Sequence, residues 1–282
     1  MTLLVTEASR VGVVMMADTL GNSGPDARSG FAKIVHGQGQ NVLLGAWGKA
    51  SVGSGRIDCW LVHFLTGCPA TLSVHELGNR LVERLNRDLA ATGRSWPHLG
   101  RRGIHIGGFA GNQAVLYHAH MGSEQGPIGP LQLEDSVALV AAAKGLTPEQ
   151  VILERRAQLR NGVYPAFQEV FDKDLELSGW GDFSSVQARV DHYRPLFIQT
   201  ASRIATIDER FNAAAITVSG VVIEPLAPCN DVGVDEPDTQ WLEGLAFAAN
   251  SSLRLTAQAA PVLARATGGR RLARSVRLGR GS

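Results

Sequence analysis

Short apolar runs rich in β-branched residues alternate with polar segments at the start of the chain. The runs Leu3–Thr6 and Val11–Ala17 flank a polar segment, Glu7–Arg10. This pattern predicts a β-hairpin. Because both runs are apolar on both faces, we expect them in an inner sheet that is covered on each side.

The expected turn sets the register of this hairpin. With a two-residue loop at Ser9-Arg10, Thr2 faces Ala17, and Asp18 lies one residue from Thr2 across the ladder. A slip of one residue would turn every side chain to the opposite face. The pattern therefore predicts an aspartate close to the start of the chain.

Further strands are predicted along the chain. Phe31–Val35 follows a turn-rich loop and precedes a second apolar run, Asn41–Gly48. Two later hairpins are expected, with turns at Gly111-Asn112 and at Ser219-Gly220. Together these segments predict antiparallel sheets.

Helical periodicity marks the segments between the strands. Ser73 and Glu76 form a capping box, followed by an apolar stripe at helical spacing: Val74, Leu77, Leu81, Leu85 and Leu89. Three further helices are predicted: Ile57–Leu65, one starting at Thr147-Pro148, and one starting at Ser184 that is kinked or broken near Pro195. Such helices would cover the sheets.

The candidate chemistry lies at the amino terminus. Removal of Met1 would leave Thr2 with a hydroxyl nucleophile and a free α-amine on one residue. An α-amine titrates near ~8, so a small downward shift makes it a general base at neutral pH. Lys33 is an unusual charge within an apolar strand, and a cation beside Thr2 would favour the unprotonated amine.

These residues resemble the N-terminal-nucleophile hydrolases of the proteasome β-subunit type, including bacterial relatives and the ancestral-β-subunit group. The family's threonine falls on Thr2, its aspartate on Asp18 and its lysine on Lys33. By resemblance, Trp47 would shape the specificity pocket and the Gly48 N–H would supply the oxyanion hole. The resemblance covers roughly residues 2–60, 103–120 and 204–227 by pattern.

The resemblance also implies the architecture: an α+β, four-layer αββα sandwich with two antiparallel sheets between helical layers. On this plan residues 1–227 form the domain, residues 121–183 are a helical insertion, and residues 228–282 are a carboxy-terminal extension. No metal or organic cofactor is implied. The implied partners are peptide or protein substrates, further copies of the chain in a ring, and an ATP-dependent unfoldase.

Two motifs of the family have no equivalent here, namely those that carry a supporting serine and a second aspartate. The nearest candidates, Ser123 and Asp208, lack the right local pattern. The sequence therefore favours a threonine-type peptidase but leaves two alternatives open. One is an inactive assembly subunit with the same fold, and the other is a small-molecule amidase.

Each of these residues can also have a purely structural role. Thr2 can be an ordinary second residue, Asp18 a strand-terminal turn former, and Lys33 an edge residue with an exposed ammonium. Trp47 can be a core aromatic and Gly48 a turn glycine.

Composition and charge set the remaining bounds. Of 282 residues, 44% are hydrophobic and 19% are charged, as expected of a globular chain with a large core. The net charge of +1 gives no signal for nucleic acid or membrane. After Glu243 the only charged residues are seven arginines, which is typical of a flexible, solvated tail. Docking of that tail on an acidic subunit face or on nucleic acid is the alternative.

Cysteine and histidine usage adds little chemistry. Three cysteines without metal-ligand spacing fit a reduced, cytoplasmic setting, and no signal-peptide pattern or apolar run long enough to span a membrane is seen. His118 and His120 share one face of a predicted strand and could bind a metal. Without a nearby carboxylate motif, such a pair is more typical of surface or cleft residues.

Overall fold

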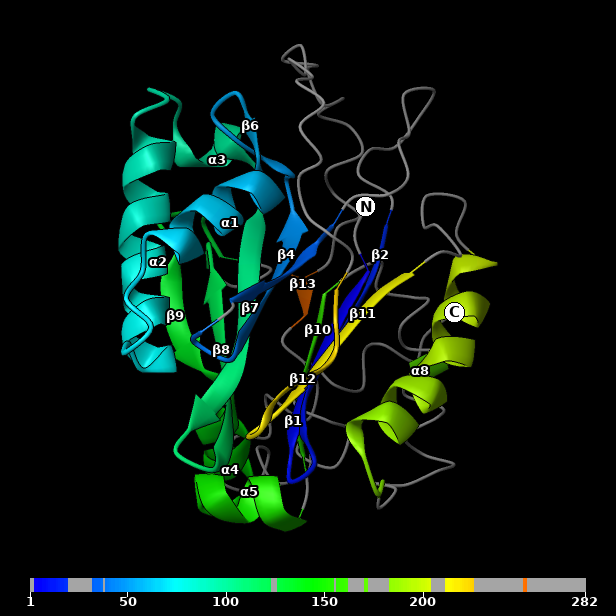
Figure 1. Cartoon of the computed structure of the whole chain (residues 1–282). Coiled ribbons are helices and arrows are strands. Elements are labelled where there is room, and N and C mark those ends of the chain that lie inside the picture. Colours follow the sequence, from blue (N-terminus) through cyan, green and yellow to red (C-terminus); the bar gives the residue numbers. More distant parts are fainter. Residues whose placement is uncertain are drawn as a thin grey trace, which may run out of the picture.

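The chain forms two stacked antiparallel sheets with helices on both outer faces, the αββα sandwich predicted from the sequence (Figure 1). The structure is a computed structural model and describes residues 3–19, 32–37, 39–122, 126–154, 156–161, 170–171, 183–203, 211–225 and 251–252.

The first sheet has six strands in the order β12-β11-β2-β1-β10-β13. Their bounds are β1 Leu4–Ser9, β2 Gly12–Asp18, β10 Arg156–Asn161, β11 Phe211–Thr217, β12 Gly220–Ile223 and β13 Ser251–Ser252. All residues of β2 are buried, as its apolar pattern predicts for a strand covered on both faces.

The second sheet has five strands in the order β3-β4-β7-β8-β9. Their bounds are β3 Ile34–Gly37, β4 Val42–Gly48, β7 Arg102–Ala110, β8 Gln113–His120 and β9 Gln132–Asp135. A small ribbon of β5 (Ser51–Val52) and β6 (Gly55–Arg56) follows β4.

Helices cover both outer faces and one end of the sandwich. On the second sheet lie α1 (Ile57–Thr66) and α2 (Val74–Ala90), with the short α3 (Trp96–Leu99), and on the first sheet lies α8 (Val186–Ala201). The helices α4 (Ser136–Lys144) and α5 (Pro148–Glu154) pack at the end opposite the start of β1 (Figure 1). The end of the sandwich at which β1 starts and β2 and β4 finish carries the candidate chemistry.

The predicted helix starts at α2 and α5 are confirmed. The Ser73 hydroxyl accepts the Glu76 N–H while the Glu76 carboxylate accepts the Ser73 N–H, and every residue of the predicted apolar stripe is buried. Thr147 and Gln150 make the same reciprocal pair before α5. In both helices, hydrogen bonds between residues three positions apart mark the start.

The predicted register of the first hairpin is wrong by two residues. Ser9 faces Gly12, so the turn is Arg10-Val11. Leu4 rather than Thr2 faces Ala17, and Leu3 lies level with Asp18. A shift of two keeps every side chain on its predicted face, which is why the alternation of the strands could not reveal it. The last hairpin turns at Val218-Ser219, one residue earlier than predicted.

Two details of α8 differ from the prediction. The cap of α8 is Ser185, not Ser184, and the helix continues through Pro195 without a break. Packing of its buried face against the first sheet offsets the hydrogen bond that proline removes. The described part of residues 121–183 contains, besides helices, β9 in one sheet and β10 in the other.

A buried ionic network joins α8 to β1. The Arg189 guanidinium donates to both oxygens of Glu7, at 2.8 and 2.6 Å, and the Tyr193 hydroxyl donates to Glu7 Oε2 at 2.5 Å. All three side chains are almost fully buried. The bidentate geometry fixes the helix on the sheet at one position.

Candidate functional site

The best-defined polar contact at this end of the sandwich is the pair of Asp18 and Lys33. Asp18 is fully buried at the end of β2, and Lys33, just before β3, is 4% exposed. Asp18 Oδ1 accepts two hydrogen bonds, one from Lys33 Nζ at 2.7 Å and one from the Leu3 N–H at 2.6 Å. A buried carboxylate requires such charge-assisted partners, so the ammonium is held beside the start of β1.

Thr2, the predicted nucleophile, lies outside the described residues, but its neighbour Leu3 is fixed. Besides donating to the Asp18 carboxylate, Leu3 accepts the Asp18 N–H through its carbonyl at 3.0 Å. Both polar backbone groups of Leu3 are therefore bound to Asp18. Of the predicted catalytic set, the structure brings Asp18 and Lys33 together next to the residue that follows Thr2.

Gly48 ends β4 in a conformation that only glycine adopts easily. Its φ is +84°, and a Cβ there would lie 2.2 Å from the Arg101 carbonyl oxygen. Ala46 donates its N–H to the Lys33 carbonyl at 2.8 Å. Because every second residue of a strand points its N–H to the same side, the Gly48 N–H is directed to the edge on which Lys33 lies.

Trp47 points into the core between the sheets and is 6% exposed. Its indole lies over Gly103, where a Cβ would come within 2.6 Å of the ring. The indole N–H donates to His118 Nε2 at 3.1 Å. The residue predicted to shape a pocket is thus packed over β7 and joined to β8.

A second polar link crosses the space between the sheets at His105. Its Nδ1 is 2.8 Å from the Thr6 hydroxyl of β1, and its Nε2 bonds to Asn161 Oδ1 of β10. His105 is fully buried, and desolvation lowers its pKa to about 3. A neutral ring that donates to Asn161 Oδ1 and accepts from the Thr6 hydroxyl has a partner on both ring nitrogens.

Next to His105 lies a cluster of His118, His120 and Glu134. Each residue offers one ligand atom, and these atoms all lie within 4.8 Å of one another. The two imidazoles stack with centroids 4.6 Å apart, and His120 Nε2 is 3.4 Å from Glu134 Oε2. Hydrogen bonding to Glu134 raises the pKa of His120, whereas burial lowers that of His118.

Glu134 is the residue of this cluster that the sequence did not indicate. It faces His118 directly because β9 pairs with β8. The two strands are joined by a Gly/Pro-rich segment whose sequence does not fix their register. The local apolar/polar alternation, Leu131–Glu134, is too short to identify a strand.

Ser123 and Asp208, the weak candidates for the supporting serine and second aspartate, lie outside the described residues. No described helix is long and apolar enough to cross a membrane.

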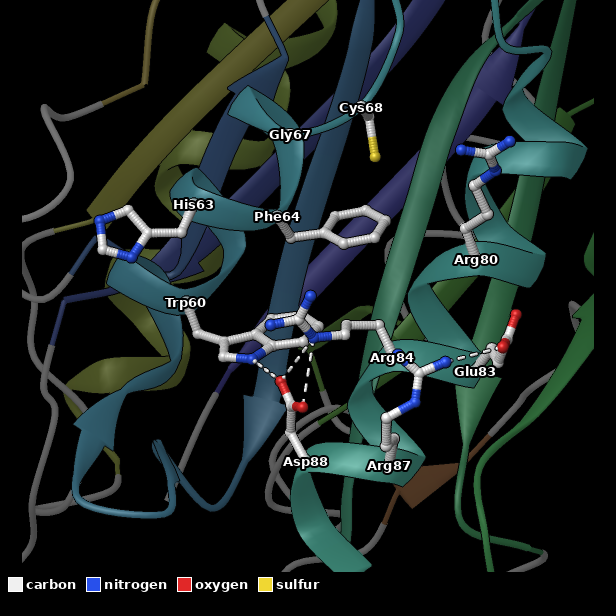
Figure 2. Close-up of a pocket in the computed structure, with 10 residues that line it drawn as sticks. All are labelled: Trp60, His63, Phe64, Gly67, Cys68, Arg80, Glu83, Arg84, Arg87 and Asp88. Carbon is white, nitrogen blue, oxygen red and sulfur yellow. Dashed lines mark hydrogen bonds and ion pairs between the residues drawn. The ribbon is translucent and has the colours of Figure 1, made fainter. Parts of the chain in front are cut away.

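A separate pocket of about 580 Å³ lies on the outer helical layer, between α1 and α2 (Figure 2). Trp60 and Phe64 stack in it, and the Trp60 N–H donates to Asp88 at 2.8 Å. Asp88 also pairs with Arg84, and Glu83 pairs with Arg87. The second sheet separates this pocket from the core between the sheets, so it is not part of the site around Asp18.

Comparison with protein-family models and with curated proteins finds no match. Among solved structures, the chain is similar to the helical assembly of the Anbu complex from Pseudomonas aeruginosa. The identity is 14% and the TM-score 0.53, over 82% of this chain and 88% of that chain. A Gly-1 mutant of Anbu from Hyphomicrobium sp. strain MC1 matches at 12% identity and a TM-score of 0.49, over 80% and 87% of the two chains. The similarity to the Pseudomonas structure concerns the fold alone, an αββα sandwich.

Proposed function

We propose that the chain is a threonine-nucleophile amide hydrolase, a proteasome-like peptidase that uses Thr2 after removal of Met1. The observation that carries this proposal is the buried Asp18 carboxylate, which holds both the Lys33 ammonium and the backbone of Leu3. An ammonium fixed beside the first strand is the electrostatic support that a terminal amine needs to act as a base.

In the proposed reaction the Thr2 hydroxyl oxygen attacks the amide carbonyl, and the α-amine of Thr2 takes the hydroxyl proton. The amine then passes this proton to the leaving nitrogen, and water releases the acyl group in the second half. Lys33 favours the unprotonated amine, and Asp18 balances its charge. The N–H of Gly48, directed to the same edge as Lys33, would stabilise the oxyanion.

We further propose that the chain works as a homo-oligomer on peptide or protein substrates, with an ATP-dependent unfoldase as a possible partner. The neighbour from Pseudomonas aeruginosa is described as a helical assembly. Native mass would distinguish a ring or helix of many 30.1 kDa chains from a monomeric or dimeric small-molecule amidase with the same fold.

The missing serine and second-aspartate motifs favour a second candidate, an inactive assembly subunit. In this form Thr2 would lack the supporting serine and second aspartate, and the sandwich would serve only to build the oligomer. A chain that retains Met1 would fit this reading.

The deciding test is the intact mass of the protein before and after incubation with a peptide epoxyketone, which needs the hydroxyl and the free amine of an N-terminal threonine. The proposal predicts loss of Met1 and one adduct that maps to Thr2. Thr2→Ala should give no adduct, and Thr2→Ser should still react. Retention of Met1 together with the absence of an adduct would rule out the hydrolase and favour the inactive assembly subunit. Processed chain without an adduct would direct the search to amidase substrates.

A further inference from the structure

The cluster of His118, His120 and Glu134 has the composition of a transition-metal site. Two imidazoles and one carboxylate are ligands that zinc and related divalent ions accept, with a further position left for water or substrate. Side chains of neighbouring strands supply them, two from β8 and one from β9. Exposure increases across the group: His118 is 3% exposed, and the side chains of His120 and Glu134 are 18% and 34% exposed.

The hydrogen bonds of His120 prepare it as a ligand. Its Nδ1 is 3.1 Å from the Gly122 carbonyl, which can only accept, so Nδ1 carries a proton. A second nitrogen whose N–H binds a backbone carbonyl is the usual arrangement around metal-bound histidines. In the neutral ring Nε2 then holds the lone pair, and it faces Glu134.

The distances fit a small divalent ion after a modest adjustment. Ligands at about 2.0–2.2 Å in tetrahedral geometry lie ~3.4 Å from each other. His120 Nε2 and Glu134 Oε2 are 3.4 Å apart, and the ligand atom of His118 lies within 4.8 Å of both. A rotation of the His118 or Glu134 side chain would close the remaining gap.

His118 connects this cluster to Trp47. Because the indole N–H only donates, His118 Nε2 accepts it, and Nδ1, which has no partner among the described residues, carries the proton. A metal ion on Nε2 would displace the indole N–H. An ion on Nδ1 would move the proton to Nε2, where it would oppose the indole N–H. Either mode disturbs the bond between Trp47 and His118.

We propose that His118, His120 and Glu134 bind one divalent transition-metal ion of the zinc class at the edge of the core between the sheets. This site is independent of Thr2 chemistry, although both adjoin the end of β4: Ala46 bonds to Lys33, and the next residue, Trp47, bonds to His118. The ion would connect β8 to β9, and its open position would bind water or an anionic group of a substrate.

The test is calorimetric titration of the tag-free protein with Zn²⁺, together with the absorption spectrum of the Co²⁺ form. We expect one ion per chain and a spectrum typical of low-coordinate Co²⁺. His120→Gln and Glu134→Gln, both at partly exposed positions, should each weaken Zn²⁺ binding at least tenfold. Two control variants, His63→Gln and Cys68→Ser, alter potential ligands outside the cluster and should leave the affinity unchanged.

Trp47 supplies a second readout. Zn²⁺ should change the tryptophan fluorescence of the wild type, and Trp47→Phe should remove that change while binding persists. Thr2→Ala should bind Zn²⁺ like the wild type, so failure of the hydrolase proposal would not affect this result. Equal affinity in wild type, His120→Gln and Glu134→Gln, or no binding at all, would overturn the metal site.

Discussion

Asp18 and Lys33 form a buried ion pair, and leaving either charge buried without the other would destabilise the fold. Breaking such a pair by removing one partner costs about 3–5 kcal/mol, because the other charge remains buried without compensation. Replacing both charges by neutral groups of similar size costs much less. The pair therefore offers a way to separate its contribution to stability from its contribution to chemistry.

Lys33→Met should lower the free energy of unfolding by about 3–5 kcal/mol and abolish the epoxyketone adduct at Thr2. The double variant Asp18→Asn/Lys33→Met should recover most of the stability, since the Asn side chain can still accept the Leu3 N–H, but not the adduct. Urea unfolding and intact mass measure the two effects. A double variant no more stable than Lys33→Met would show that the two charges are not coupled.

At the scale of the element, α2 is the helix whose start the sequence defines most completely. Its capping box satisfies two backbone groups at the first turn, and its buried stripe faces the second sheet. The N-cap of α3, Ser95, is also a serine, but its hydroxyl makes no hydrogen bond to the backbone of its helix. The two serines thus form a matched pair.

Ser73→Ala should destabilise the protein by about 1 kcal/mol, because the Glu76 N–H loses its acceptor. Ser95→Ala should change the stability by less than half of that. Chemical denaturation of both variants with the wild type measures the difference. Equal effects would mean that the hydroxyl of Ser73 does not act through the cap.

The elements that the sequence predicts well are those with local signals. The helix starts at Ser73 and Thr147 and the hairpin turn at Gly111-Asn112 depend on residues within one or two turns of chain. The shifted turn at Arg10-Val11 and the continuous helix through Pro195 depend instead on packing between layers. Periodicity does not carry that information.

The candidate site divides in the same way. Asp18 and Lys33 could be predicted because a resemblance supplied their partnership, and the structure brings them within 2.7 Å. The contact of Trp47 with His118 requires the missing side chain at Gly103, and Glu134 reaches His118 only through the register of β8 with β9. Such contacts between strands depend on three-dimensional pairing that a single sequence does not encode locally.

Across the whole molecule, His105 connects the two sheets, from Thr6 and Asn161 on one side to β7 on the other. Burial lowers its pKa to about 3 in the folded chain, against about 6.5 for an unfolded histidine. The unfolded state therefore binds more protons between these values, so the stability contributed by neutral His105 is complete above pH 6.5 and is lost as the pH falls.

When the pH is lowered from 7.5 to 5, the protonation of His105 in the unfolded state should by itself lower the free energy of unfolding by about 2 kcal/mol. His118 acts in the same direction, whereas the raised pKa of His120 opposes it. Comparison with His105→Gln separates these effects: the stability advantage of the wild type should shrink by about 2 kcal/mol over this range. His98→Gln, on the surface, should follow the wild type. Parallel curves for His105→Gln and the wild type would show that His105 does not titrate on unfolding.

The two backbone bonds between Leu3 and Asp18 also have a practical consequence for how the protein is produced. Because both polar groups of Leu3 are bound inside the sandwich, any residues fused before Thr2 must leave the fold directly beside the Asp18–Lys33 pair. An affinity tag at that end would block removal of Met1 and occupy the space next to Lys33. Purification handles should therefore be attached at the carboxyl end, and amino-terminally tagged preparations should be judged only after cleavage that leaves Thr2 first.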